Sequence, residues 1–172
     1  MSLLTPMLRS SPLTDWFSDA QRVQGMLDFE AALAQAQAAC GMVPPEAVGP
    51  IVAACRHEAI DFAALGEAAV GAGNLAIPLV KQLTAQVKAQ DPEAARYVHW
   101  GATSQDAIDT GLVLQLRGAL DAAETLLEQL LAALALQADR YRDTVMPGRT
   151  WMQHALLSLI HISEPTRLGM IS

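Results

Sequence analysis

The longest unbroken pattern in the sequence runs from Ser104 to about Asp143 and predicts a single helix of roughly forty residues. At 1.5 Å per residue such a helix is ~60 Å long. Apolar residues that mark one face of it are Ile108, Leu112, Leu116, Leu120, Leu127, Leu130 and Leu134. Between Leu126 and Leu136 apolar residues point in several directions, so this half requires cover on more than one side. No upstream segment is long enough to provide it, so missing helices or neighbouring subunits must do so. We expect this segment to be substantially exposed in the chain alone.

The composition agrees with closely packed helices. Hydrophobic residues make up 52% and aromatic residues 5% of the chain, and the apolar residues are mostly Ala and Leu rather than the Val, Ile, Tyr and Phe of a sheet. The sequence therefore predicts an all-α fold. A net charge of -7 without a Lys/Arg cluster argues against a nucleic-acid partner.

The cysteines and the hydropathy pattern bear on the compartment. Cys40 and Cys55 do not have the spacing of metal ligands, which favours a reduced, cytoplasmic setting. No signal peptide is visible at the N-terminus, and no apolar run of ~18 or more residues predicts a membrane span.

Four shorter helices are predicted upstream, after an irregular segment from Met1 to Phe17. Their starts and ends are marked by Ser, Asp, Asn, Pro and Gly residues. They run from Ser18-Asp19 to Gly41, from Pro45 to about His57, from Asp61 to about Val70 and from Asn74 to about Gln90. Asp28 and Glu30 lie within the first helix and are expected to be solvated or paired surface charges.

The stretch just before the long helix carries the most chemistry. An imidazole, His99, precedes Gly101 and the adjacent hydroxyls of Thr103 and Ser104, and Ser104 is expected to be the N-cap. A helix start has backbone N–H groups without intrahelical partners and a dipole that favours negative charge. These groups can together hold a carboxylate, although Thr-Ser-Gln-Asp by itself equally fits a plain capping motif.

His-Trp-Gly-Ala-Thr-Ser-Gln-Asp, followed by Asp109-Thr110, resembles the first signature of the fumarase/aspartase superfamily, whose members share an all-helical fold. The segment Met26 to Ala34 also resembles the first long helix of that superfamily. Gly71 and Gly73 permit tight backbone before Asn74, which by itself fits a plain helix cap. Gly-Asn followed by Ile-Pro-Leu-Val-Lys, however, resembles the 3-carboxy-cis,cis-muconate cycloisomerases, where lyases of purine metabolism usually carry a histidine.

A second motif, from Pro147 to Leu156, departs from the common superfamily form Gly-Arg-Thr-His. Trp151 takes the histidine position here, and an indole N–H donates a hydrogen bond but cannot exchange a proton near neutral pH. Acid–base duty therefore cannot be transferred to Trp151, which in the simplest alternative packs in a core. Gly-Arg-Thr-Trp-x-Gln-His-Ala is the form that resembles the carboxymuconate cycloisomerases. His154 fits a satisfied structural histidine as well as a site residue.

The resemblance implies addition or elimination next to a carboxylate, through a carboxylate-stabilised carbanion. A cycloisomerase does this within one molecule and gives 4-carboxymuconolactone in protocatechuate (β-ketoadipate) breakdown. The resemblance implies no metal or organic cofactor, a tricarboxylate substrate and a homotetramer built around long helices. The lack of a long apolar run leaves no membrane partner expected. The site residues it implies are catalytic His99, Thr103 and Ser104 and substrate-binding Asn74, Arg149, Trp151 and Gln153.

Two other functions remain open from the sequence. One is an adenylosuccinate- or argininosuccinate-type lyase, against which Trp151 argues. The other is a non-catalytic helical interaction module in which the polar motifs only cap helices.

The last sixteen residues, 157–172, resemble a translated sequencing adaptor rather than the rest of the chain. The sequence thus predicts an N-terminal helical domain (1–102), the start of a truncated central helical bundle (103–156) and a non-native tail (157–172). We expect an N-terminal fragment that is inactive alone, because superfamily active sites combine regions from different subunits. An independently amplified copy of the gene should diverge at or just after Leu156.

Overall fold

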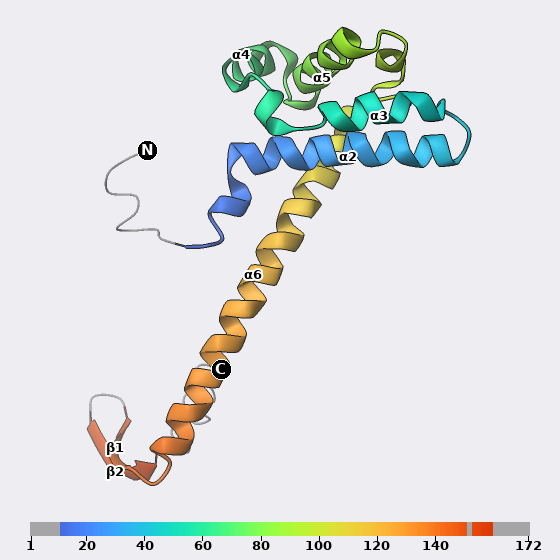
Figure 1. The fold of residues 1–172 in the computed structure, drawn as a ribbon. Coiled ribbons are helices and arrows are strands. Elements are labelled where there is room, and N and C mark those ends of the chain that lie inside the picture. Colours follow the sequence, from blue (N-terminus) through green and yellow to red (C-terminus); the bar gives the residue numbers. More distant parts are fainter. Residues whose placement is uncertain (1–10, 151–152, 160–172) are drawn as a thin grey trace. The chain divides into compact units, whose positions relative to one another are not determined.

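The computed structural model describes residues 11–150 and 153–159; for Met146 and for the strand residues from Gly148 onward it describes the backbone alone. Contacts within the chain form two units, Met1–Ala122 and Ala123–Ser172. The predicted domain boundary between residues 102 and 103 stays a prediction. The helical elements, in chain order, are η1 (Asp15–Phe17), α2 (Asp19–Ala39), α3 (Pro45–Ala54), η2 (His57–Ala59), α4 (Phe62–Ala72), α5 (Ala76–Gln90), η3 (Ala94–Tyr97) and α6 (Ser104–Arg140) (Figure 1).

Every described element of the first unit is helical, which confirms the predicted all-α class there. The second unit adds one exception, an antiparallel hairpin of β1 (Val145–Thr150) and β2 (Gln153–Leu159). Three of the paired β2 residues, Leu157 to Leu159, belong to the segment predicted to be foreign, and residues 160–172 of that segment lie outside the described residues.

The predicted helix starts of the first unit are confirmed by their caps. Ser18 Oγ accepts a hydrogen bond from the Gln21 backbone N–H at the start of α2, and Asp61 Oδ1 accepts one from Ala64 at the start of α4. Such caps satisfy N–H groups that the helix itself leaves unpaired. α3 ends at Ala54, earlier than predicted, and the short η2 follows it.

The core of the first unit lies among α2, α3, α4 and α5. Its largest fully buried side chains are Leu27, Val43, Ile51, Leu65, Leu79, Leu83 and Val87. Burying each of them stabilises the fold by about 1.5–3 kcal/mol. This core fixes the positions of α2 and of the start of α5. Residues of α2 and α6, together with Asn74 and Leu75 just before α5, line the cavity described below.

Helix α6 meets α2 through glycines. A Cβ on Gly25 would lie 2.8 Å from the Gly111 carbonyl oxygen, and a Cβ on Gly111 would lie 2.9 Å from the Met26 nitrogen. About two turns further on, the Trp16 ring lies against Gly118, so a Cβ there would overlap the ring. The backbones of α2 and α6 can approach this closely because glycine, which has no side chain, lies at the crossing in both helices: Gly25 in α2 and Gly111 in α6.

The face of α6 that is buried within the chain consists of the small residues Ala107, Gly111 and Ala119 together with Gln115. The leucine face marked by the sequence remains open, with Leu112 45%, Leu116 40% and Leu120 65% exposed. Small residues permit the close crossing with α2, whereas leucines at the same positions would hold the helices apart.

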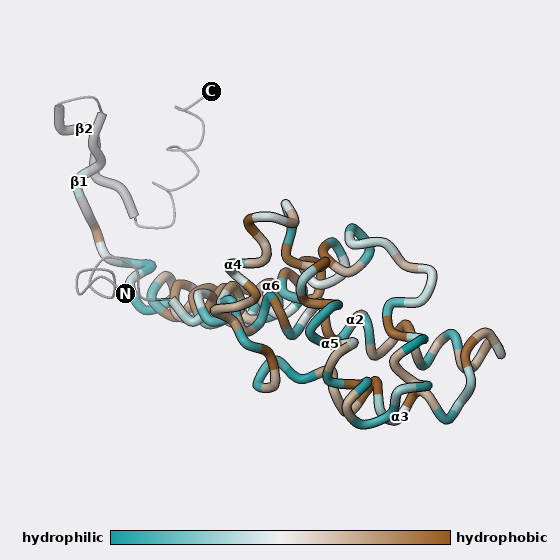
Figure 2. Tube along the Cα trace, turned by 90° about the horizontal axis from the view of Figure 1, so that it is seen from above, coloured by the Kyte–Doolittle hydropathy of each residue, from teal (hydrophilic) through white to brown (hydrophobic). Residues whose placement is uncertain are grey.

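The second half of α6 confirms the predicted exposure. Exposed fractions there are 42% for Leu126, 58% for Leu127, 53% for Leu130, 65% for Leu131, 56% for Leu134 and 68% for Leu136. Figure 2 colours the chain by hydropathy, and both hydrophobic and hydrophilic positions occur along α6. No helix among the described residues is long and apolar enough to cross a membrane.

Candidate active site

The loop between η3 and α6 carries the predicted catalytic residues and has an unusual backbone. His99 has a φ of 56° and Gly101 a φ of 70°, both in the left-handed region. Glycine adopts this conformation freely, whereas a histidine does so at a cost that its surroundings must offset. The loop is held to α2 by Gln37, whose Nε2 donates to the Trp100 carbonyl oxygen at 2.7 Å.

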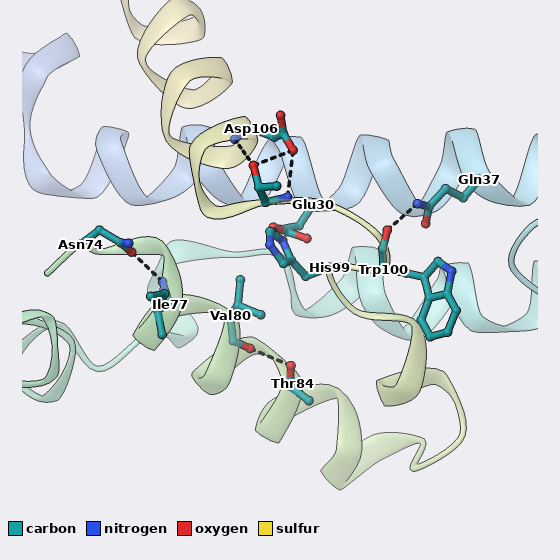
Figure 3. Close-up of polar contacts among 10 residues, drawn as sticks. Glu30, Gln37, Asn74, Ile77, Val80, Thr84, His99, Trp100 and Asp106 are labelled. Atoms are coloured by element: carbon teal, nitrogen blue, oxygen red, sulfur yellow. Dashed lines mark hydrogen bonds and ion pairs between the residues drawn. The ribbon is translucent and has the colours of Figure 1, made fainter. Parts of the chain in front are cut away.

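His99 is paired with a buried carboxylate from α2 (Figure 3). Its Nδ1 lies 2.5 Å from Glu30 Oε1, with the His99 side chain 16% and the Glu30 side chain 2% exposed. Burial raises the pKa of Glu30 above its ordinary value, and the hydrogen bond with His99 opposes that rise. Glu30 was expected to be a surface charge, and this was wrong because Glu30 follows Val23, Met26 and Leu27 on the buried face of α2.

Thr103, not Ser104, caps α6. The Thr103 backbone N–H and its hydroxyl donate to Asp106 Oδ2 at 2.8 and 2.9 Å, and Thr103 Oγ1 in turn accepts from the Asp106 N–H at 3.4 Å. This is a capping box, in which each of the two side chains accepts a hydrogen bond from the backbone N–H of the other residue. Two hydrogen bonds hold the pKa of Asp106 below its ordinary value. The larger effect comes from the Thr103 backbone N–H and the smaller from the Thr103 hydroxyl. The N-cap prediction for Ser104 was wrong because Ser104 is the first residue inside the helix.

Ser104 is the predicted site hydroxyl that the cap leaves available. It is half-buried, and no hydrogen bond to it is found within the described part of the chain. Because Asp106 already occupies the amide and hydroxyl of Thr103, a bound carboxylate would meet the Ser104 hydroxyl and the following first-turn amides first.

Asn74 lies at a cavity beside α6. Its Oδ1 accepts from the Ile77 N–H at 3.0 Å, so the plain cap holds, while the amide Nδ2 keeps its donors. The cavity has a volume of about 300 Å³ and is lined by Arg22, Met26, Asn74, Leu75, Ile108, Leu112 and Gln115. Ile108 stands one helical turn after Ser104, so the cavity borders the first turns of α6. Its wall is mostly apolar, and Arg22 is the charged residue that lines it.

The remaining predicted site residues belong to the second unit. Arg149 lies in β1 and Gln153 in β2, where only their backbone is described, and Trp151 lies outside the described residues. Their predicted roles stay predictions. Arg149 pairs in the hairpin with His154, whose side chain also lies outside the described part.

The residue that sequence reasoning missed is Glu30. Its spacing along α2 places it among the buried apolar residues, a signal available from the sequence. That His99 is its partner could not be predicted from the sequence, because the two residues are 69 positions apart. No group of three or more His, Cys, Asp or Glu side chains suited to a metal ion is found in the described residues.

The first unit is helical, and the loop that leads into α6 holds the buried His99–Glu30 pair. Residues 8–170 match the lyase family, and the chain belongs to that family. The match runs through part of the segment 157–172, whose foreign origin stays a prediction.

Within this family the chain is similar to cycloisomerases. It is 58% identical over 161 residues to the 3-carboxy-cis,cis-muconate cycloisomerase of Pseudomonas aeruginosa, covering 94% of this chain and 33% of that protein. It is 56% identical to the enzyme of that name from Bradyrhizobium diazoefficiens, covering 90% and 34%. The crystal structure of the 3-carboxy-cis,cis-muconate lactonizing enzyme from Pseudomonas putida superposes with a TM-score of 0.91 at 51% identity, covering 97% and 38%. The chain thus spans about a third of the length of the curated relatives it matches.

Proposed function

We propose that this chain forms part of a 3-carboxy-cis,cis-muconate cycloisomerase. In the reaction, one carboxylate oxygen of the substrate adds to a carbon of a double bond, and a proton adds to the neighbouring carbon, giving 4-carboxymuconolactone. The observation that carries the proposal is the identity above 50% to cycloisomerases of this name over at least nine-tenths of the chain. Trp151, in place of the histidine of other lyases, supports the same choice.

The start of α6 suits a substrate with several carboxylates. The Ser104 hydroxyl and the first-turn amides present hydrogen-bond donors where the helix dipole also favours negative charge. In the neighbouring cavity, Asn74 and Arg22 provide polar donors next to apolar walls that fit the carbon chain of such a substrate. His99 precedes Thr103 in the sequence, and its imidazole is the proposed group for exchanging a proton with the substrate.

The proposal extends to assembly and setting. The exposed leucines of α6 support a homotetramer in which long helices bury one another, since a continuous apolar face on a protein usually marks an interface. A cytoplasmic enzyme fits the free cysteines Cys40 and Cys55. The proposed reaction of protocatechuate degradation needs no metal or organic cofactor.

The test uses enzyme produced from a complete gene that contains this chain. The purified enzyme should convert 3-carboxy-cis,cis-muconate to the lactone, as followed by loss of the diene absorbance and by NMR of the product. Adenylosuccinate and argininosuccinate serve as comparison substrates. Absence of lactone from a folded, purified enzyme would overturn the proposal.

Ser104→Ala tests the site. A hydrogen bond from a hydroxyl to a charged group contributes about 1.5–3 kcal/mol, so kcat/KM should fall by roughly 10- to 150-fold. Thr84→Ala is the matched control, because Thr84 Oγ1 donates only to the Val80 carbonyl oxygen of its own helix. Kinetics of Ser104→Ala equal to those of the control would remove Ser104 from the site.

A further inference from the structure

The buried pair of Glu30 and His99 joins two segments that are distant in the sequence. Glu30 comes from the middle of α2, and His99 comes from the loop that enters α6. Glu30 Oε1 is engaged by His99 Nδ1, while Glu30 Oε2 is buried and has no hydrogen-bond partner among the described residues. A buried carboxylate oxygen without a partner costs free energy, so the carboxylate is not explained by stability alone.

The ring of His99 is held at one end. Its Nδ1 faces Glu30, and no hydrogen bond to Nε2 is found among the residues that the structure describes. The side chain is only 16% exposed, so the ring cannot turn freely in solvent. The left-handed φ of His99 adds a second cost that the fold accepts in order to place this ring.

We propose that Glu30 is a positioning residue that holds His99 through Nδ1 and leaves Nε2 as the nitrogen that exchanges a proton with the substrate. The inference rests on the proposed function and names the group through which His99 acts in it. With the Nδ1 proton donated to the Glu30 carboxylate, the neutral ring keeps its lone pair on Nε2. During lactonisation Nε2–H of the protonated ring delivers the proton to the carbon next to the substrate carboxylate, and the ring returns to the neutral Nδ1–H form.

The first test needs only the 172-residue chain and no variant of Glu30. Long-range proton–nitrogen NMR distinguishes the two ring nitrogens of each of the four histidines, and His99→Asn identifies the His99 signals. The neutral His99 ring is expected to carry its proton on Nδ1. A neutral ring protonated on Nε2 would overturn the inference, whatever the activity of the complete enzyme.

The second test uses the complete enzyme. Glu30→Gln keeps the shape of the side chain but removes the carboxylate, and it should lower kcat by at least about tenfold, a fraction of the roughly 10²–10⁴-fold that a positioned acid or base contributes. KM should change little, because in this proposal Glu30 acts on His99 and not on the substrate. A loss confined to KM would contradict the positioning role.

Two controls separate positioning from a structural effect. Gln37→Ala removes another hydrogen bond between α2 and the same loop and should lower kcat by less than Glu30→Gln does. An equal loss in Gln37→Ala and Glu30→Gln would mean that loosening the loop is sufficient, and would overturn the proposal. In the His99→Asn background Glu30→Gln should have no further effect, whereas additive losses would show that Glu30 does not act through His99.

These outcomes are independent of the proposed reaction. A wild-type enzyme that forms no lactone defeats the proposed function, while the ring measurement still decides how His99 is held. An enzyme that forms lactone with its His99 protonated on Nε2 defeats the inference alone.

Discussion

Replacing Gly111 with alanine tests whether the glycine crossing sets the position of α6 on α2. In an open helix this substitution stabilises a protein by about 0.5–1 kcal/mol, because glycine loses more backbone freedom on folding than alanine. At Gly111 the new Cβ would lie 2.9 Å from the Met26 nitrogen and 3.1 Å from the Gly25 carbonyl carbon. Both neighbours are backbone atoms and cannot turn aside as a side chain can.

Overpacking of this kind typically costs about 1–3 kcal/mol. Because the added Cβ would contact the backbone of two residues, the cost at Gly111 should lie in the upper part of that range. After the helix gain is subtracted, Gly111→Ala should lower the free energy of unfolding by about 1–2 kcal/mol. Gly66→Ala is the matched control: Gly66 lies inside α4, is exposed and has nothing within 4 Å of an added Cβ. It should raise stability by about 0.5–1 kcal/mol.

The assay is urea unfolding of the 172-residue chain followed by circular dichroism, with both variants measured beside the wild type. The decisive quantity is the difference between the two alanine variants, about 1.5–3 kcal/mol in favour of Gly66→Ala. Gly111→Ala as stable as Gly66→Ala would refute the close crossing of α2 and α6.

Further predictions concern titration, reactivity and assembly. Burial, with the Glu30 charge in second place, raises the pKa of the Cys55 thiol to about 12, so a thiol reagent at neutral pH should modify exposed Cys40 in the folded chain and Cys55 only after unfolding in urea. Because the pKa of Asp106 is lowered in the folded state, its stabilising contribution is present above the ordinary aspartate pKa and lost as pH falls through the lowered value. The midpoint of thermal unfolding of Asp106→Asn should therefore lie below that of the wild type at pH 7. At strongly acid pH the two midpoints should be equal. In the complete protein Leu130→Glu should reduce the molecular mass measured by light scattering, and an unchanged mass would count against an interface at Leu130.

The helices of the first unit could be predicted from local signals. Ser18, Asp61 and Asn74 lie where a polar side chain must satisfy N–H groups that a helix start leaves unpaired, and all three accept such hydrogen bonds in the structure. The length of α6 followed in the same way from its apolar spacing. Local signals are reliable here because each depends on residues only a few positions apart.

The packing of α6 could not be predicted from the leucine pattern. The leucines suggest the buried face, yet the face that meets α2 is the one with Gly111 and Ala107. A leucine stripe shows only that some partner is needed, not whether that partner is in the same chain. The glycines of α2 and α6 carry the information, but only when their positions are known to face each other.

The cap at α6 shows the limit of reasoning from residue types at a site. Thr103 and Ser104 are adjacent hydroxyls with the same preference for the N-cap, and the sequence motif fits either. What separates them is Asp106, which lies three residues after Thr103 and therefore at the capping-box position relative to Thr103 alone. The acidic residue that completes the cap also fills the anion position that the amide of Thr103 would offer. Thr103 therefore holds the helix start, which leaves the hydroxyl of Ser104 for the carboxylate binding proposed above.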